Sequence, residues 1–172
     1  MVDIKDIILG TGNYNNVKSG NTVSITGDGG NAWKYYGASY KKLAPRLKTY
    51  LNYANKYQKL LKIEDINEYT RFREEIEDEY IKSYYETRLK ELDVYELLDT
   101  LYNIFGSNII LLCHEDINEF CHRRLVADFI ELKTGIYISE ISIQDNKVKH
   151  LISIRYKNRL KKYLWMKISI SL

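Results

Sequence analysis

The sequence predicts an α/β fold: a single small three-layer domain built around a mostly parallel sheet, followed by a basic C-terminal extension. Short apolar runs of strand length alternate along the chain with apolar residues at helical spacing, as in βα units. One run, Ile109–Leu112, is apolar at every position, which is typical of a strand buried on both faces of a parallel sheet. We place the α/β domain at residues 1–143 and the extension at residues 144–172.

The composition is that of one globular domain. The 172 residues are 45% hydrophobic and 28% charged, values that exclude a largely disordered chain. No apolar run approaches the roughly 18–20 residues of a membrane span, and the first residues lack the pattern of a signal peptide. The two cysteines, Cys113 and Cys121, do not make a disulfide framework. We therefore expect a cytoplasmic protein with reduced thiols and no membrane partner.

Strands and glycine-rich loops are expected in the N-terminal part. Ile4–Leu9 is mostly apolar and leads into Gly10-Thr11-Gly12-Asn13, which predicts a strand followed by a turn. Thr22–Thr26 is rich in β-branched residues and predicts a second strand, and Gly27–Asn31 predicts a flexible loop after it. If both strands are parallel, the two loops meet at the same edge of the sheet.

Three helices are expected next. Pro45 suits the first turn of a helix that extends to about Leu61. The segment Asp65–Lys90 predicts a long helix, and one of its faces carries Ile76, Tyr80 and Tyr84. Asp93 is a good N-cap for a helix over Val94–Phe105.

The following segment predicts a βα unit. Gly106 ends the preceding helix, and the strand Ile109–Leu112 is followed by a helix over about Glu119–Lys133 and by a strand over Ile136–Ile143. A right-handed crossover between parallel strands is expected for this order, and the resulting arrangement is Rossmann-like.

The C-terminal extension is strongly basic. It carries Asp145 as its one acidic residue against eight basic residues, namely Lys147, Lys149, Arg155, Lys157, Arg159, Lys161, Lys162 and Lys167. Apolar residues at helical spacing predict a basic amphipathic helix in Asn146–Met166. Nucleic acid is one partner for the Lys147–Lys167 segment, because lysine and arginine neutralise phosphates. The alternative is a solvated face that docks on the acidic remainder of the chain.

Chemically reactive side chains gather around the loop after the strand Ile109–Leu112. Cys113, His114 and Glu115 end the strand, and the next helix opens on Cys121-His122-Arg123-Arg124. Ligands of open α/β sheets bind at this edge, so we expect the functional site here.

Each of these residues has a functional and a structural interpretation. Cys121, in the first turn of a helix, is a candidate nucleophile or a packed thiol, and His122 is a candidate acid–base group or a packing residue. Arg123 and Arg124 can bind an anion beside free helix N–H groups, or one of them can pair with Glu115 across the loop.

Two further binding elements are weaker. Gly10, Thr11 and Gly12 form a candidate phosphate loop, although the third glycine of a dinucleotide motif is missing. Cys113 is a candidate ligand-binding residue or a small apolar side chain. Cys113, His114, Cys121 and His122 offer four metal ligands, but the short-spaced pairs of structural zinc sites are absent. We therefore expect no metal and no cofactor.

The same segments resemble a known family. Leu111-Leu112-Cys113-His114-Glu115, Phe120–Ala127 (F-C-H-R-R-L-V-A) and Ile138-Ser139-Glu140-Ile141 resemble the C-terminal hallmark of the domain-of-unknown-function family 488. Upstream, the segments that are similar are Val23-Ser24-Ile25, Tyr40–Pro45 and Tyr80…Tyr84…Leu89, so that the resemblance extends from about Ile7 to Ile141. The chain departs from the family at His114, where an aromatic is usual, in the glycine-rich loop after Ile25, and after Ile143, where the resemblance ends.

The resemblance implies a distant similarity to small α/β domains that handle nucleotides or nucleosides, without a settled activity. Together with the residues, it suggests an enzyme or sensor acting on a small nucleotide- or nucleoside-like anion bound at the Cys113–Arg124 loop. Arg123 and Arg124 would hold the anion, Glu115 or His122 would transfer protons, and Cys121 would be the nucleophile. The alternatives are a non-catalytic module that binds a small anion, and nucleic-acid binding through the basic segment.

Overall fold

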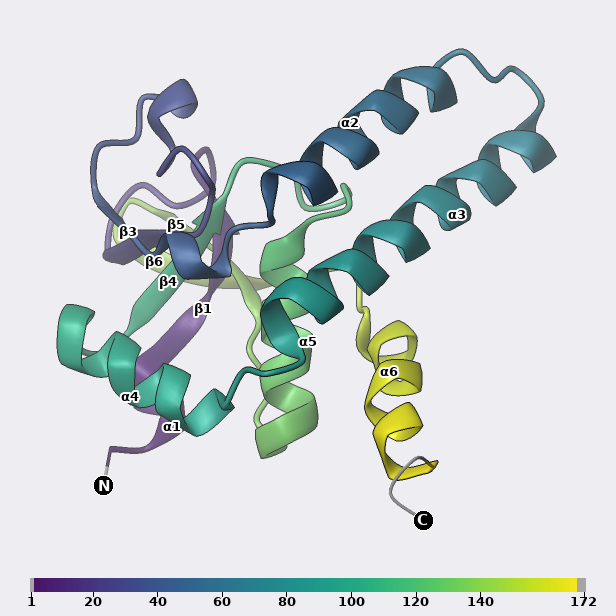
Figure 1. Ribbon diagram of the computed structural model, residues 1–172. Coiled ribbons are helices and arrows are strands. Elements are labelled where there is room, and N and C mark those ends of the chain that lie inside the picture. Colours follow the sequence, from purple (N-terminus) through teal and green to yellow (C-terminus); the bar gives the residue numbers. More distant parts are fainter. Residues whose placement is uncertain (1, 170–172) are drawn as a thin grey trace.

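The chain folds around a six-stranded sheet with the strand order β3-β2-β4-β1-β5-β6 (Figure 1). The computed structural model describes residues 2–169. Five strands are parallel and β6 is antiparallel to β5. The strands are β1 (Ile8–Asn13), β2 (Asn21–Ser24), β3 (Ala38–Ser39), β4 (Ile109–Cys113), β5 (Glu140–Gln144) and β6 (Lys147–Leu151). The predicted α/β class with a mostly parallel, Rossmann-like sheet is confirmed.

Helices connect the strands. The α-helices are α1 (Ile4–Ile7), α2 (Leu47–Leu60), α3 (Ile66–Tyr84), α4 (Val94–Phe105), α5 (His122–Thr134) and α6 (Lys157–Ser169). The short helices are η1 (Asn31–Trp33) and η2 (Lys41–Leu43), and a π-helical turn, η3 (Tyr85–Leu89), continues α3. No helix within residues 2–169 has the length and the apolar composition needed to cross a lipid bilayer.

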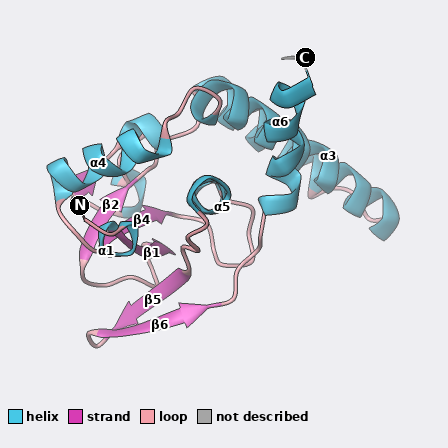
Figure 2. Cartoon of the chain, turned by 90° about the horizontal axis from the view of Figure 1, so that it is seen from below, coloured by secondary structure: helices cyan, strands magenta, loops and turns pink. Residues whose placement is uncertain are grey.

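The core lies mainly between the sheet and the helices. Figure 2 shows α4 and α5 over one face of the sheet, with α6 outside α5. Residues of β4 alternate between the two faces: Ile109 and Leu111 belong to the large cluster under the helices, whereas Ile110 and Leu112 belong to a smaller cluster with Val17 and residues of β5. Both faces of β4 are therefore buried, as its continuous apolar sequence predicts.

The helix boundaries agree with their capping signals. The Asp93 side chain accepts hydrogen bonds from the backbone N–H groups of Tyr95 and Glu96, and α4 ends at Gly106, whose φ is 83°. Helix α5 likewise ends at Gly135, which is left-handed. The predicted start of α5 at Glu119 is wrong, because the Glu119 side chain and backbone N–H instead close a turn with Asp116.

The predicted turn at residues 10–13 is also wrong. Ile4–Ile7 is a short helix, and β1 continues through Asn13, so that Gly10 and Gly12 lie within a strand. A Cβ atom on Gly12 would lie 2.5 Å from Cγ2 of Val17, and one on Gly10 would lie 2.8 Å from the carbonyl oxygen of Ser139. The glycines permit close packing around a central strand instead of a turn.

Helix α5 is tied to the sheet by buried charges. The Arg123 guanidinium contacts the Glu140 carboxylate at 2.8 Å, and both side chains are 1% exposed. Arg124 donates hydrogen bonds to Thr11 Oγ1 at 2.8 Å and to the carbonyl oxygen of Ile138 at 2.9 Å. Thr11 in turn donates to Glu140, so that α5, β1 and β5 share one polar network.

Residues 144–169 of the predicted extension are built into the same sheet and core. A single helix over Asn146–Met166 is wrong in its first part, because Lys147–Leu151 pairs with β5 as β6. Tyr156, Leu160 and Tyr163 belong to the large core cluster, and β5 begins at Glu140 instead of Ile136. Residues 170–172 of the extension lie outside the described residues.

We predict that the C-terminal helix contributes to the stability of the whole domain. Leu160→Ala, at a fully buried position, should lower the free energy of unfolding by about 2–5 kcal/mol because it opens a cavity. Trp165→Ala on the same helix, where the side chain is 68% exposed, should change it by no more than about 0.5 kcal/mol. Urea unfolding followed by circular dichroism measures both values, and equal effects would contradict the packing described here.

A second prediction concerns the buried ion pair. Arg123→Ala should lower the free energy of unfolding by about 3–5 kcal/mol, because Glu140 would stay buried without its partner. Arg71→Ala, at an exposed position of α3, is the matched control and should be nearly neutral. The same unfolding experiment applies, and a neutral Arg123→Ala variant would show that the pair does not hold α5 on the sheet.

Candidate functional site

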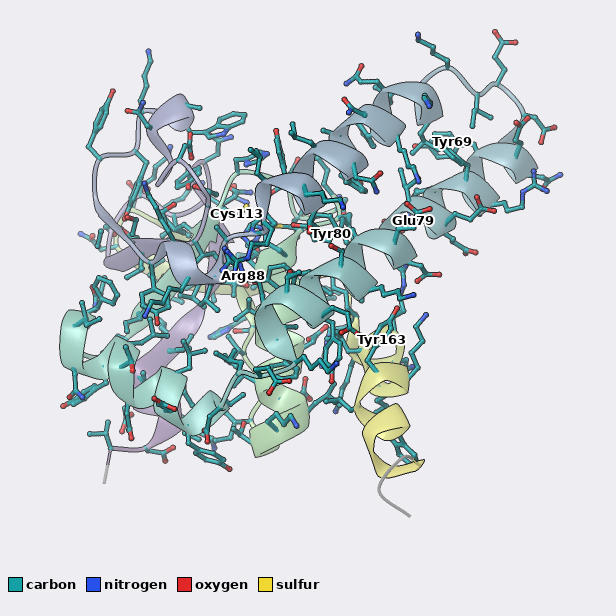
Figure 3. The ribbon with its side chains drawn as sticks, viewed as in Figure 1. Tyr69, Glu79, Tyr80, Arg88, Cys113 and Tyr163 are labelled. Atoms are coloured by element: carbon teal, nitrogen blue, oxygen red, sulfur yellow. The ribbon has the colours of Figure 1, made fainter. Side chains whose placement is uncertain are left out.

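A pocket of about 1220 Å³ lies where the helical pair α2–α3 meets the sheet. Its inner wall is formed by the residues that follow β2 and β4 and by the start of α5, and α2 and α3 form the opposite wall. Figure 3 shows Cys113, Arg88 and Tyr80 at this junction, whereas Tyr69 lies towards the far end of the helical pair. The pocket is therefore at the predicted carboxyl edge of the parallel strands.

Four side chains form a compact group on the inner wall, which we call the cysteine cluster: Cys113, Glu115, Cys121 and His122. Oε2 of Glu115 lies 2.7 Å from Sγ of Cys113 and 3.0 Å from Sγ of Cys121. Sγ of Cys113 lies 3.8 Å from Nδ1 of His122. Both cysteines are buried and unpaired by a disulfide, and all four residues line the pocket.

The backbone orients the His122 ring. Its Nε2 lies 2.8 Å from the carbonyl oxygen of Ile25, which follows β2. Because a carbonyl oxygen only accepts, Nε2 carries the hydrogen and Nδ1 is the nitrogen that faces the thiols. His122 is also the first residue of α5, so its position is fixed by the helix that the Arg123–Glu140 pair holds.

Burial and the close contacts shift the acidities in the cluster. Burial raises the pKa of Glu115 to about 8, and the neighbouring Cys121 charge adds to this, so that near neutral pH the carboxyl group holds its proton and can donate it. Burial also raises the pKa of Cys113. For Cys121, burial alone would raise the pKa, but the hydrogen bond from Cys113 and the charges of Arg123 and His122 hold it well below its ordinary value.

The same interactions act on His122. Burial by itself would lower its pKa, but the hydrogen bond with Cys121 and the negative charge of Cys121 raise it above the ordinary value. The two shifts share one cause, because a negative charge on Cys121 and a positive charge on His122 favour each other.

The other walls of the pocket are aromatic and cationic. The Trp33 ring stacks on His114 with ring centroids 5.0 Å apart and is half exposed at the rim. The aromatic side chains that line the pocket are Trp33, Tyr50, Tyr53, Tyr57, Tyr69, Tyr80 and Phe120. The basic side chains are Lys41, Arg73 and Arg88, together with His114 and His122.

Arg88 is the half-buried cation of this wall. Its Nε donates a 2.6 Å hydrogen bond to the carbonyl oxygen of Ala44, and we find no hydrogen bond or ion pair to its two terminal nitrogens among the described residues. Burial and the nearby Arg46 lower its pKa below that of an ordinary arginine. Arg88 is thus held at one point and keeps donors for an anion.

The structure brings together some of the predicted site residues and not others. Cys113, Glu115, Cys121 and His122 meet, but Arg123 and Arg124 do not line the pocket, because both are buried in the core, where they contact Glu140, Thr11 and the Ile138 carbonyl. The anion site predicted on these two arginines therefore lies outside this pocket. Gly10, Thr11 and Gly12 do not line the pocket either, because they form part of β1.

Glu115 does not pair with either arginine. Its carboxylate instead contacts the two thiols and, through Oε1, Nε2 of His114 at 3.3 Å. The charge of Arg123, which is buried in the core next to the cluster, still lowers the pKa of Cys121.

Sequence reasoning suggested Trp33 as a stacking residue but missed Arg88 and the pocket-lining tyrosines of α2 and α3. Arg88 lies in a helical segment that the sequence predicts as α-helix, and the π-helical turn at Tyr85–Leu89 has no signal of its own in the sequence. The loop after β2 also differs from expectation: the Asp28 carboxylate accepts hydrogen bonds from the backbone N–H groups of Gly30 and Ala32, which also lower the pKa of Asp28. The loop is therefore held by Asp28.

Much of the charge of the basic C-terminal segment is paired within the domain. Arg155 and Lys157 contact Glu131, and Arg155 also contacts Asp128. Arg159 contacts Glu77 and Asp78 on α3. These pairs support the alternative in which the segment docks on acidic parts of the same chain.

Comparisons with known proteins place this site within a family. The family described as Domain of unknown function DUF488 matches residues 36–130, which is more than half of the 172-residue chain. The match extends from β3 into α5 and contains the whole cysteine cluster and both helices of the opposite wall. No curated protein and no solved structure matches the chain. The chain belongs to the family of domains of unknown function DUF488.

Proposed function

We propose that this protein is an enzyme that acts on a small nucleotide- or nucleoside-like anion bound in the pocket. The observation that carries the proposal is the cysteine cluster: two thiols, a carboxyl group and an imidazole lie in contact on the wall of a pocket. Burying polar groups of this kind costs free energy. Ligand-binding pockets are typically concave, are lined by aromatic residues and contain a few such polar groups, so we interpret the cluster as part of a ligand site.

The aromatic wall suits the ring of the ligand. Trp33 at the rim and the tyrosines of α2 and α3 offer flat surfaces on which a nucleobase can stack. The anionic group is assigned to Arg88, with Lys41, which also lines the pocket, as a second cation. Arg88 and Lys41 thus take the anion-binding role that the sequence suggested for Arg123 and Arg124, whose guanidinium groups form contacts in the core.

Glu115 is the residue assigned to proton transfer. It lines the pocket and contacts both sulfur atoms, so that a proton can pass between the ligand and the cluster through its carboxyl group. Cys121 and His122 lie beside it at the start of α5 and complete the cluster.

The first prediction of this proposal concerns binding. In a thermal-shift screen of nucleosides, nucleoside monophosphates and sugar phosphates, a ligand at about 100 times its Kd should raise the Tm of the wild-type protein by about 5–10 °C. Arg88→Gln should lose most of this shift, whereas Arg71→Gln, outside the pocket, should keep it. If no compound of these classes shifts the wild-type protein, the proposal is wrong.

The second prediction separates catalysis from binding. With a ligand found in the screen, Glu115→Gln should retain the thermal shift and lose product formation by about 10²–10⁴-fold, because the proton-transferring group is removed. Glu119→Gln is the matched control, since Glu119 also lines the pocket but caps a turn at Asp116. Mass spectrometry of the reaction mixture measures the product. Equal turnover in wild type and Glu115→Gln would contradict the assigned role.

A further inference from the structure

The geometry points to a metal site within the cysteine cluster. We propose that Sγ of Cys113, Sγ of Cys121 and Nδ1 of His122 bind one Zn²⁺ ion, with a fourth position open to the pocket. The sequence spacing disfavours a metal, yet the ligand atoms of these three residues lie within 4.8 Å of one another. The proposal depends on the proposed function only for the use of the ion in a reaction.

The separation of Cys113 and His122 fits two ligands of a tetrahedral ion. Zinc bonds of about 2.3 Å to sulfur and about 2.0 Å to nitrogen place a sulfur and a nitrogen ligand about 3.5 Å apart. Sγ of Cys113 and Nδ1 of His122 are 3.8 Å apart, so an ion between them requires only a small movement. Two thiolates and an imidazole are the ligand types that favour Zn²⁺ over Mg²⁺ or Ca²⁺.

The surroundings orient these ligands as they do in known zinc sites. Metal-bound histidines usually donate their second ring N–H to a carbonyl or carboxylate, and here Nε2 of His122 lies 2.8 Å from the carbonyl oxygen of Ile25. Cys113 ends the central strand β4, and Cys121 is the N-cap residue of α5. All three ligands are buried and sit on rigid elements, which keeps their geometry fixed.

The open position is the reason to connect this ion with the pocket. Three protein ligands of the Cys₂His type leave one site for water or substrate, which is the arrangement of catalytic rather than structural zinc. The three ligands line the pocket, and Glu115 lies beside both sulfurs. Its contacts of 2.7 and 3.0 Å are shorter than the separation of two zinc ligands, so we place Glu115 next to the ion and not among its ligands.

A second set of potential ligands exists beside the first. Cys113, His114 and Glu115 also come within 4.8 Å of one another, but His114 and Glu115 are partly exposed. The His114 ring stacks on Trp33, and its Nε2 contacts Glu115. We therefore assign the ion to the fully buried set, and His114 becomes the discriminating control.

The test is metal binding by the full-length reduced protein without any ligand. Co²⁺ is titrated as a spectroscopic substitute for Zn²⁺ after removal of bound metal with a chelator. We expect one Co²⁺ per chain, a thiolate-to-cobalt charge-transfer band, tetrahedral d–d bands in the visible region, and loss of both signals when one equivalent of Zn²⁺ is added. Zinc should also raise the Tm of the wild-type protein.

Variants locate the ion. Cys113→Ser, Cys121→Ser and His122→Gln should each weaken Co²⁺ binding by more than the 10–100-fold that loss of an outer-shell partner costs. His114→Gln and His150→Gln, which remove the other two histidines, should bind as the wild type does. Circular dichroism identifies a variant that has not folded, and the wild-type stoichiometry does not depend on any variant.

The outcomes are separable. Absence of the charge-transfer band in the wild-type protein would overturn the metal site, as would loss of binding in His114→Gln with normal binding in His122→Gln. A nucleoside or nucleotide that stabilises a protein unable to bind Co²⁺ or Zn²⁺ would leave the proposed function standing without the metal. Stoichiometric cobalt binding in a protein that responds to no compound of the screen would support the metal site alone.

Discussion

The buried contact between Arg123 and Glu140 is the constraint on which the rest of the site depends. Removing two charges from water is costly, and only close, well-aligned contacts compensate for it, so the pair permits little sliding or rotation of α5 against β5. Glu140 is paired with Thr11 of the central strand β1, which extends the constraint across the sheet. As a result, the two residues that precede and begin the helix, Cys121 and His122, are held against the end of β4.

The local signals of the sequence were sufficient for most elements. Asp93, Gly106 and Gly135 mark helix ends where the structure has them, because caps act over a few residues. Gly10 and Gly12 led to a wrong prediction of a turn. Their role is close packing, Gly10 against Ser139, which is distant in the sequence, and Gly12 against Val17, which follows a bend that the sequence does not reveal. The hairpin to β6 had a signal in the sequence, because Asp145 and Asn146 are residue types that tolerate a positive φ. Both residues have a positive φ in the structure, as two-residue hairpin turns require, and this signal outweighs the helical spacing of the apolar residues.

The candidate site was predictable in part. Its location followed from a strand, a loop and a helix start, and Cys113, Glu115, Cys121 and His122 do meet there. The roles of Arg123 and Arg124 were not predictable, because whether an arginine faces a ligand or the core depends on an acid elsewhere in the chain, here Glu140. The spacing rule that disfavours a metal applies to ligands on short loops, whereas the ligands proposed here come from a strand end and a helix start brought together by the fold.

The helices α2 and α3 give the pocket a second wall that does not belong to the sheet. The pair projects from the sheet and meets it only at its base (Figure 1), while the cysteine cluster belongs to the sheet edge and α5. Tyr53 of α2 contacts Phe120, the residue before Cys121, whereas Tyr57, which also lines the pocket, stacks only on Tyr53 among the described rings. If the pocket binds its ligand as proposed, substitutions at such positions of the hairpin would alter ligand preference while leaving the cysteine cluster in place, which gives evolution a route to new ligands on one scaffold.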